Sequence, residues 1–302
     1  MSREYIVRVP VATIWTNPEA PRKIDEKAVS YPLEMKDWLK EMTTEERRLL
    51  CDNNLVQSQV LYGQQVTVKE EKGEWFHVLV PEQPSSKDDG GYPGWLPKNQ
   101  VISREKTDVT DTTASVAVTA QTAWLYEGTE PVLEVSFQTR LPLVNETEDW
   151  ITVKTPDGDR LIKAADAEVI DSQEESENVN GEKLVETGAA FLGLQYLWGG
   201  MSGFGFDCSG FTYTIHRTFG ITIPRDASDQ ARQGELVERA SLKKGDCLYF
   251  AKEEGQGRVY HVGMYYGDNK MIHAPSTGKG IEVVEIGTTK YDKDYCTARR
   301  FW

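Results

Sequence analysis

Two stretches of the chain repeat one pattern of apolar and polar positions. Residues 64–80 read QQVTVKEEKGEWFHVLV, and residues 139–155 read TRLPLVNETEDWITVKT. In each stretch, an alternating apolar segment leads to a charged turn, then to an acidic residue and a tryptophan (Trp75 and Trp150), and then to further alternation. Period-two alternation bounded by turn residues indicates short strands of a small barrel or sandwich. The repeat therefore predicts two small all-β domains.

The first copy carries an insertion with a different period. Residues 31–50, YPLEMKDWLKEMTTEERRLL, place their apolar side chains at broadly helical spacings. We expect one or two helices there, as a helical cover on the first β domain.

The character of the chain changes after the second copy. Residues 171–182, DSQEESENVNGE, are acidic and polar with almost nothing to bury, which is typical of a linker. From Lys183, the segment KLVETGAAFLGLQYLWGG predicts a helix that ends before Gly199. A second helix is expected to follow Cys208 and to stop at Gly220. Four β-like segments come next: DCLYFA, VYHVGMYYG, KMIHA and IEVVEI.

Helices followed by a run of strands predict an α+β domain. A prior of roughly 150 residues per domain allows two or three domains in a chain of 302 residues. The predicted organisation is a first β domain with its helical insertion at 1–105, a second β domain at 106–170, the linker at 171–182 and the α+β domain at 183–302.

Composition excludes several classes of partner. The net charge is −14, and nucleic-acid binding needs clustered Lys and Arg, so we expect no nucleic-acid partner. Anionic lipid surfaces and anionic wall polymers are disfavoured for the same reason. No apolar run approaches the ~20 residues of a membrane helix, and the N-terminal segment shows no secretory signal. These features favour a cytoplasmic protein with no membrane partner; they leave the oligomeric state open.

The cysteines are dispersed along the chain. Cys51, Cys208, Cys247 and Cys296 form no CxxC pair, so neither a zinc cluster nor a dense disulfide framework is expected. Free thiols fit a reducing compartment. The sequence predicts no metal site and no cofactor.

One of these thiols stands where a nucleophile is activated. Cys208, in FDCSGF, precedes the predicted second helix, and a helix N-terminus presents unpaired N–H groups and the positive end of the helix dipole, which favour thiolate. The neighbouring residues Asp207 and Ser209 are small or polar and permit close approach of a substrate. The alternative is a buried and inert cysteine.

A nucleophilic cysteine needs a base, and the chain has four histidines. His77 lies in a strand of the first β domain, and His216 lies about 12 Å along the helix from Cys208. His261 and His273 remain, in β-like segments joined by Gly-Asp-Asn, which is a hairpin signal. A thiol, a base and a second imidazole that orients the base form the nucleophile–base–orienter set of acyl-transfer enzymes.

The register of this hairpin decides whether the two imidazoles share a face. A three-residue loop at 267–269 places His273 opposite Gly263 and on the face of His261. A two-residue loop at 268–269 shifts His273 by one residue to the other face, unless a bulge intervenes. The sequence leaves these alternatives open.

Five segments, FDCSGF, IPRDASDQ, KKGDCLYF, HVGMYYG and MIHAP, resemble the NlpC/P60 cysteine peptidases in order and spacing. The resemblance covers about residues 183–302 and implies a papain-like α+β core that cuts cell-wall peptides. The N-terminal repeat resembles bacterial SH3-like domains, most clearly at Gly94-Trp95-Leu96. Together with the helical insertion, this organisation is similar to that of YkfC-type members, which are γ-D-glutamyl-L-diamino acid endopeptidases acting on murein peptides with a free N-terminal L-Ala.

The resemblance implies a role for each matching residue. Cys208 takes the position of the nucleophile, His261 that of the general base and His273 that of the third polar residue. The Cys208 backbone N–H and the Tyr196 hydroxyl are implied as donors to the oxyanion. In such proteins the first SH3-like domain supplies a tyrosine that closes over the catalytic cleft, and Tyr92 is its candidate.

The substrate contacts implied in this way are Tyr92, Tyr196, Trp198, Asp207, Ser209, Asp226 and Ser228. Asp226 matches the carboxylate that holds the free amine of the substrate; its alternative role is a helix N-cap. The family pattern often carries a serine directly after this aspartate, where this chain has Ala227 and then Ser228. Gln57 and Gln59 stand in the neighbourhood where relatives carry an acidic residue.

The sequence thus predicts a cysteine endopeptidase of cell-wall peptide recycling or degradation, with murein tripeptides and tetrapeptides as substrates. The diamino acid is meso-diaminopimelate or L-Lys. Two alternatives stay open. The SH3-like repeats of a non-catalytic protein could bind peptidoglycan, although the intact cysteine and histidine set argues against this. The same core could also act as an amidase or acyltransferase on another substrate.

Overall fold

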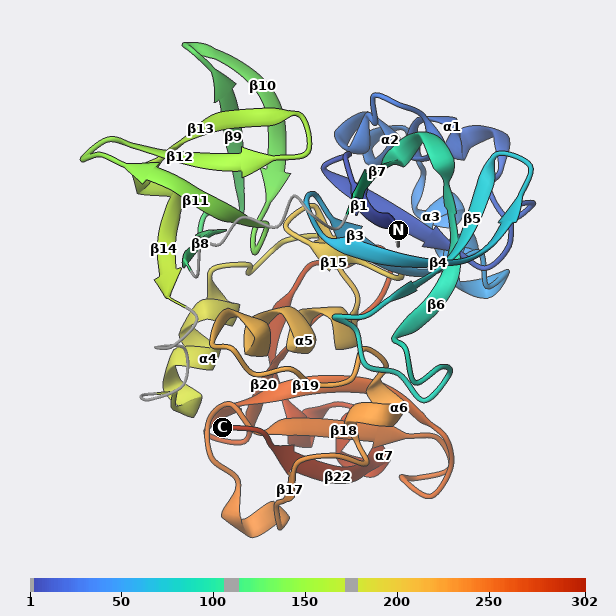
Figure 1. Ribbon diagram of the computed structural model, residues 1–302. Helices are drawn as coiled ribbons and strands as arrows, with labels where there is room; N and C mark the ends of the chain where they lie inside the picture. The colour runs from blue at the N-terminus through green and yellow to red at the C-terminus, as the bar shows by residue number, and fades with distance from the viewer. Residues whose placement is uncertain (1–2, 106–113, 172–178) are drawn as a thin grey trace. The chain divides into compact units, whose positions relative to one another are not determined.

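The computed structural model describes residues 3–105, 114–171 and 179–302 (Figure 1). Contacts between residues divide the chain into two compact units. The first unit comprises Met1–Pro81, Tyr92–Glu175 and Ser202–Phe204, and the second comprises Glu82–Gly91, Ser176–Met201 and Gly205–Trp302. The predicted boundaries at 105, 170 and 182 stay predictions, because the two barrels of the first unit group together and a loop of the first barrel groups with the second unit.

The first unit contains two sheets of seven strands each, and both follow the same path. The order is β3-β2-β6-β5-β4-β1-β7 in the first sheet and β10-β9-β13-β12-β11-β8-β14 in the second, so each strand number in the second sheet is seven higher. The strands of the first sheet are β1 (Arg3–Val7), β2 (Val11–Trp15), β3 (Val56–Leu61), β4 (Gln65–Lys72), β5 (Trp75–Val80), β6 (Tyr92–Pro97) and β7 (Val101–Glu105). The strands of the second sheet are β8 (Ala114–Val118), β9 (Thr122–Glu127), β10 (Glu130–Ser136), β11 (Arg140–Glu146), β12 (Trp150–Thr155), β13 (Gly158–Lys163) and β14 (Ala167–Asp171). The repeat that the sequence predicts is confirmed at the level of topology.

Short helices fill the connection between β2 and β3. They are the 3-10 helix η1 (Lys23–Asp25) and the α-helices α1 (Glu26–Val29), α2 (Met35–Glu41) and α3 (Thr44–Asp52). Trp38 of α2 packs near Trp15 of β2, and its indole N–H donates to the buried Asp25 carboxylate at 2.9 Å. A capping box between Thr43 and Glu46 starts α3. The helical insertion is therefore present, and it extends further towards the N-terminus than residues 31–50.

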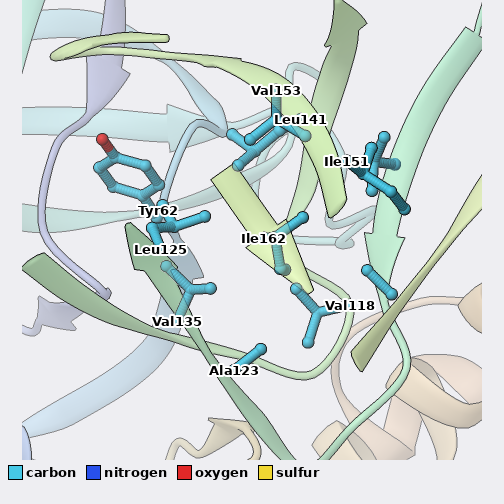
Figure 2. Close-up of a cluster of buried hydrophobic side chains, with 11 residues drawn as sticks. Tyr62, Val118, Ala123, Leu125, Val135, Leu141, Ile151, Val153 and Ile162 are labelled. Atoms are coloured by element: carbon cyan, nitrogen blue, oxygen red, sulfur yellow. The ribbon is translucent and has the colours of Figure 1, made fainter. Parts of the chain in front are cut away.

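The core of the second barrel includes one side chain from the first. Tyr62, which follows β3, packs among the buried residues Val116, Leu125, Val135 and Ile162 (Figure 2). Its hydroxyl donates to Asp157 at 3.0 Å, so the buried phenol keeps a hydrogen-bond partner. This shared core explains why the two barrels form one unit.

The second unit has helices first and then an antiparallel sheet, as an α+β domain requires. Its helices are α4 (Gly181–Ala189), α5 (Cys208–Thr218), α6 (Ala227–Gln230) and α7 (Tyr291–Asp294). The sheet has the order β17-β22-β18-β19-β20-β21, and α4 and α5 both contact β19. Its strands are β17 (Glu235–Leu236), β18 (Cys247–Ala251), β19 (Val259–Gly267), β20 (Lys270–His273), β21 (Glu282–Glu285) and β22 (Tyr295–Arg300), and a short hairpin of β15 (Met201–Ser202) and β16 (Gly205–Phe206) precedes α5. The predicted fold class is confirmed.

One predicted helix is shorter than the sequence suggested. The periodic segment from Lys183 predicts a helix up to Gly199, but α4 ends at Ala189. Beyond it, Gln195 forms a bridge with Gly280, and the Tyr196 N–H donates to the Lys279 carbonyl at 2.9 Å. Pairing with a segment that is distant in sequence overrides the local helical pattern there.

The start of α4 also differs from the predicted linker. Of residues 171–182, residues 172–178 lie outside the described part of the chain. The helix begins at Gly181, two residues earlier than expected, because the Asn180 side chain accepts a hydrogen bond from the Lys183 N–H at 3.0 Å and caps it. Within the described ranges, none of the helices has the length and apolar character needed to span a bilayer.

Candidate active site

Cys208 is the first residue of α5, as predicted. The Asp207 side chain caps this helix by accepting from the Gly210 N–H at 2.7 Å. Gly210 is required by packing, because a Cβ there would lie 2.0 Å from the Gly200 carbonyl oxygen. The DCSG motif therefore combines a cap, a thiol and a close backbone contact that fixes the start of the helix against the segment before it.

The Asp207 carboxylate is held entirely within the protein. Arg225 donates to one oxygen at 2.6 Å, and the Gly199 N–H donates to the same oxygen at 3.0 Å. Ser209 donates to the other oxygen at 3.2 Å and accepts from Arg225 at 2.9 Å. Because Asp207 and Ser209 are both nearly buried, their side chains in this structure organise the backbone around Cys208.

His261 and His273 share one face of the sheet. His261 lies on β19 and His273 on β20, and the His261 Nε2 is 2.7 Å from the His273 Nδ1. The turn is the two-residue Asp268-Asn269, with φ values of 50° and 57°. A register shift between Tyr265 and Gly267 then restores the pairing that puts both histidines on one face. Of the alternatives that the sequence left open, the bulge is the one observed.

Burial keeps these groups uncharged in the resting structure. Desolvation, with a contribution from the Asp207 charge, raises the pKa of the Cys208 thiol to about 12, although the Val262 and Ser209 backbone N–H groups act in the opposite direction. Burial also lowers the pKa of His261 well below its usual value and the pKa of His273 to about 4. Burial thus acts against the thiolate that the helix start was predicted to favour, and the activation of Cys208 stays a prediction.

Tyr291 packs against this pair of histidines, and no pattern in the sequence predicts it. Its ring stacks on His261 with centroids 5.0 Å apart and meets His273 edge-on at 5.3 Å. Burial raises the pKa of the Tyr291 hydroxyl, and a negative charge on Cys208 would raise it further, so the two groups lie within electrostatic range of each other. Tyr291 belongs to the four-residue helix α7 in a charged segment, where neither periodicity nor a motif marks it.

Asp226 lies at the N-cap position of α6 but does not cap it with its side chain. The carboxylate instead meets the Lys87 ammonium at 3.0 Å and the Arg225 guanidinium at 3.6 Å. Lys87 belongs to the loop Glu82–Gly91, which groups with the second unit. The Ser86 N–H and the Ser86 hydroxyl each donate a hydrogen bond of 2.9 Å to the Asp229 carboxylate. These two bonds hold the loop in place.

The other predicted substrate contacts belong to both units. Tyr196 is 6% exposed, and Trp198, two residues further along the chain, is half-buried. Tyr92 is the first residue of β6 in the first unit and is 2% exposed. Ser228 lines a groove of about 670 Å³ with residues such as Arg232 and Cys296, and this lining includes neither Cys208 nor His261.

The two glutamines are both hydrogen-bonded. The Gln57 amide nitrogen donates to Thr16 at 2.8 Å and to Asn54 at 3.0 Å. The Gln59 carbonyl oxygen accepts from the Ser202 hydroxyl at 3.1 Å, within the first unit.

A second cysteine–histidine pair lies inside the same unit. The Cys247 Sγ is 4.0 Å from the His216 Nε2, and the His216 Nδ1 bonds the Thr212 carbonyl at 2.8 Å. Both residues are fully buried, and burial raises the pKa of Cys247 to about 12. This pair has no access to a substrate, so Cys208 is the cysteine that the geometry favours for catalysis.

A thiol at a helix start and two hydrogen-bonded imidazoles on adjacent strands of an antiparallel sheet are the arrangement typical of a papain-like thiol hydrolase. Comparisons with known proteins support the same class of enzyme. The NlpC/P60 family model matches residues 193–300, and a model described as the YKFC SH3b2 domain matches residues 118–169. The γ-D-glutamyl-L-lysine dipeptidyl-peptidase of Bacillus subtilis (strain 168) is 46% identical over 96% of this chain and 96% of its own.

Two further comparisons cover nearly the whole chain. The γ-D-glutamyl-L-lysine dipeptidyl-peptidase of Bacillus cereus is 41% identical over 98% of this chain and 90% of its own. The crystal structure of an NlpC/P60 family protein from Bacillus cereus superimposes with a TM-score of 0.95 at 40% identity, covering 99% of both chains. The chain therefore belongs to the NlpC/P60 family and is a cysteine peptidase with two SH3-like barrels before its papain-like domain.

Proposed function

We propose that this protein is a cysteine endopeptidase that hydrolyses the bond between γ-D-Glu and an L-diamino acid in murein peptides with a free N-terminal L-Ala. The observation that carries the proposal is the His261–His273 hydrogen bond of 2.7 Å in the unit that presents Cys208 at a helix start. The names of two relatives, each matching at least 96% of this chain, support the bond that is cut.

The proposed chemistry uses only these three side chains at the reacting centre. His261 removes the proton from the Cys208 thiol as the sulfur attacks the γ-carbonyl carbon of D-Glu. The carbon–nitrogen bond then breaks, His261 returns the proton to the departing amine of the diamino acid, and a thioester remains. Water adds to the thioester by the same route and releases the D-Glu carboxylate and the thiol.

The uncharged Cys208 thiol and the uncharged His261 imidazole fit this sequence of steps. Because burial disfavours both thiolate and imidazolium, proton transfer is coupled to the attack rather than completed before it. The Cys208 N–H is proposed to donate to the oxyanion, with the Tyr196 hydroxyl as the second donor. Trp198 and the backbone fixed by Asp207 and Ser209 are proposed to border the substrate.

Asp226 is proposed to bind the substrate's ammonium. Its carboxylate does not serve as a helix cap, is partly exposed and already accepts one ammonium, that of Lys87 at 3.0 Å. A peptide with a free N-terminus carries an ammonium group with the same charge as that of Lys87. We therefore infer that the substrate's N-terminus takes the place of Lys87, whereas an acylated N-terminus gains nothing from this carboxylate.

A direct test compares a free peptide with its N-acetylated form. Asp226→Ala is expected to raise KM for L-Ala-γ-D-Glu-L-Lys by about tenfold, because a charge-assisted hydrogen bond is lost, and to leave KM for the N-acetylated peptide unchanged. An equal rise for both peptides would remove the anchoring role from Asp226.

Three further features belong to this proposal. Tyr92 is kept as the candidate tyrosine that closes the cleft, and the partition into domains at 105, 170 and 182 is kept as proposed. A cytoplasmic location is supported by the four cysteines, none of which forms a disulfide. Fractionation of the source cells with antibody detection tests the location.

A further inference from the structure

Glu282 lies beside the second imidazole on the side away from His261. His273 of β20 and Glu282 of β21 are directly paired in the antiparallel ladder. The Glu282 Oε1 is 3.7 Å from the His273 Nε2, and the same oxygen is 3.7 Å from the Lys279 ammonium. His273 is 1% exposed, and within the described part of the chain no protein atom hydrogen-bonds its Nε2.

The hydrogen bond between the imidazoles has two possible directions. A neutral imidazole carries one N–H and one lone pair. If the His261 Nε2–H donates to the His273 Nδ1, then His261 keeps a lone pair on Nδ1 and His273 carries its own proton on Nε2. If the His273 Nδ1–H donates instead, His261 carries its proton on Nδ1 and has no basic nitrogen left for the thiol.

The carboxylate distinguishes these two arrangements. In the productive arrangement an N–H of His273 faces Glu282, which is attractive. In the other arrangement a lone pair faces a negative charge, which is repulsive. We propose that Glu282 is a positioning residue that selects the tautomer of His273 and thereby leaves His261 with a basic Nδ1. The proposal rests on the catalytic roles of Cys208, His261 and His273 proposed above.

The surrounding charges act on the protonated form of the two imidazoles. Burial is the main cause that lowers the pKa of each imidazole, and the charges of Lys279 on His273 and of Lys290 on His261 lower it further. Tyr291 packs on both rings without an ionic charge, because burial raises the pKa of its hydroxyl. The Glu282 carboxylate opposes the two lysines and stabilises the imidazolium that forms when His261 takes the thiol proton.

The test uses two substitutions and one control. Glu282→Leu removes both the acceptor and the charge, whereas Glu282→Gln keeps an oxygen that accepts from Nε2–H. Glu285→Gln removes an exposed carboxylate from the same strand and is the matched control. We expect kcat to fall about tenfold in Glu282→Leu and about threefold in Glu282→Gln, with KM unchanged, because only the proton transfer is affected.

The pH profile separates this role from a purely structural one. Loss of the carboxylate is expected to move the acid limb of kcat down by about half a pH unit in both variants, since an imidazolium is then less stable. Equal losses of kcat in the Leu and Gln variants with an unmoved acid limb would overturn the proposal, as would kcat in Glu282→Leu equal to that of the control.

A second readout does not depend on the peptide substrate. The rate at which iodoacetamide alkylates Cys208, followed by peptide mass mapping, reports proton transfer from the thiol to His261. We expect Glu282→Leu to slow this rate several-fold and Glu282→Gln to slow it less. If the wild type cleaves no murein peptide but alkylation follows this order, the proposed substrate fails and the role of Glu282 stands. If alkylation is the same in all three variants, the role of Glu282 fails, whatever the substrate.

Discussion

The His261 Nε2 and the His273 Nδ1 lie 2.7 Å apart, although the two residues are twelve positions apart in the chain and lie on the two strands of a bulged hairpin. This contact fixes the ring of the proposed base. It also ties catalysis to the register of two strands, since a slip of one residue would carry His273 to the other face of the sheet.

Replacing His273 tests the weight of this contact. Asn places its side-chain oxygen near the position of Nδ1, so His273→Asn still accepts from the His261 N–H, whereas His273→Ala does not. We expect kcat to fall about a hundredfold in the Ala variant and about tenfold in the Asn variant, with both variants folded. Steady-state kinetics with circular dichroism as a folding control measures this. Equal activity of the two variants would show that the acceptor is not what matters.

Lys87 competes with the substrate in the proposed scheme, because its ammonium lies 3.0 Å from the Asp226 carboxylate. Lys87→Met should therefore lower KM for free-amine peptides about two- to fivefold, the range set by the worth of an exposed ion pair, and leave kcat unchanged. Lys244→Met, which breaks an exposed pair with Glu182, is the control. A rise in KM would mean that Lys87 assists the substrate instead of competing with it.

His216 predicts a pH dependence of stability that is independent of catalysis. Burial lowers its pKa from 6.5 to about 4, so the folded protein binds fewer protons than the unfolded chain between these values. The contribution of His216 to the free energy of unfolding is therefore fully present above pH 6.5 and is lost as the pH falls towards 4. Between pH 7.5 and pH 5 this residue accounts for about 2 kcal/mol of the free energy of unfolding.

Urea unfolding at the two pH values checks this figure. His216→Gln removes the titrating group, so the drop in the free energy of unfolding on acidification should be smaller in the variant by about the same amount. An identical drop in the variant and the wild type would assign the acid sensitivity to other groups.

The fold was predictable where local patterns and tertiary packing agree. The alternation on both sides of Trp75 and of Trp150 predicted two barrels, and the two sheets have the same strand order. The helix after Cys208 followed from apolar residues every four positions and the stop at Gly220, whose φ is 72°. Cys208, His261 and His273 could be selected because few residues in the chain are able to form such a set.

The parts that sequence reasoning missed depend on contacts between distant residues. The end of α4 is set by the pairing of Gln195 with Gly280, and no local signal records that pairing. Tyr291 reaches the histidines from a four-residue helix. Lys87 meets Asp226 from the loop Glu82–Gly91, which groups with the second unit although it is distant in sequence. The hairpin residues allow a three-residue loop, a two-residue loop, or a two-residue loop with a bulge. Packing selects the loop with the bulge.

The proposed function requires that Cys208 cuts the γ-D-Glu bond of a free-amine murein peptide. Its most direct test is mass spectrometry of L-Ala-γ-D-Glu-meso-diaminopimelate after incubation with the wild type and with Cys208→Ala, beside the N-acetylated peptide. We expect L-Ala-D-Glu from the free peptide with the wild type only, and intact peptide in every other reaction. Release of the dipeptide by folded Cys208→Ala, or no cleavage by the wild type, would contradict it.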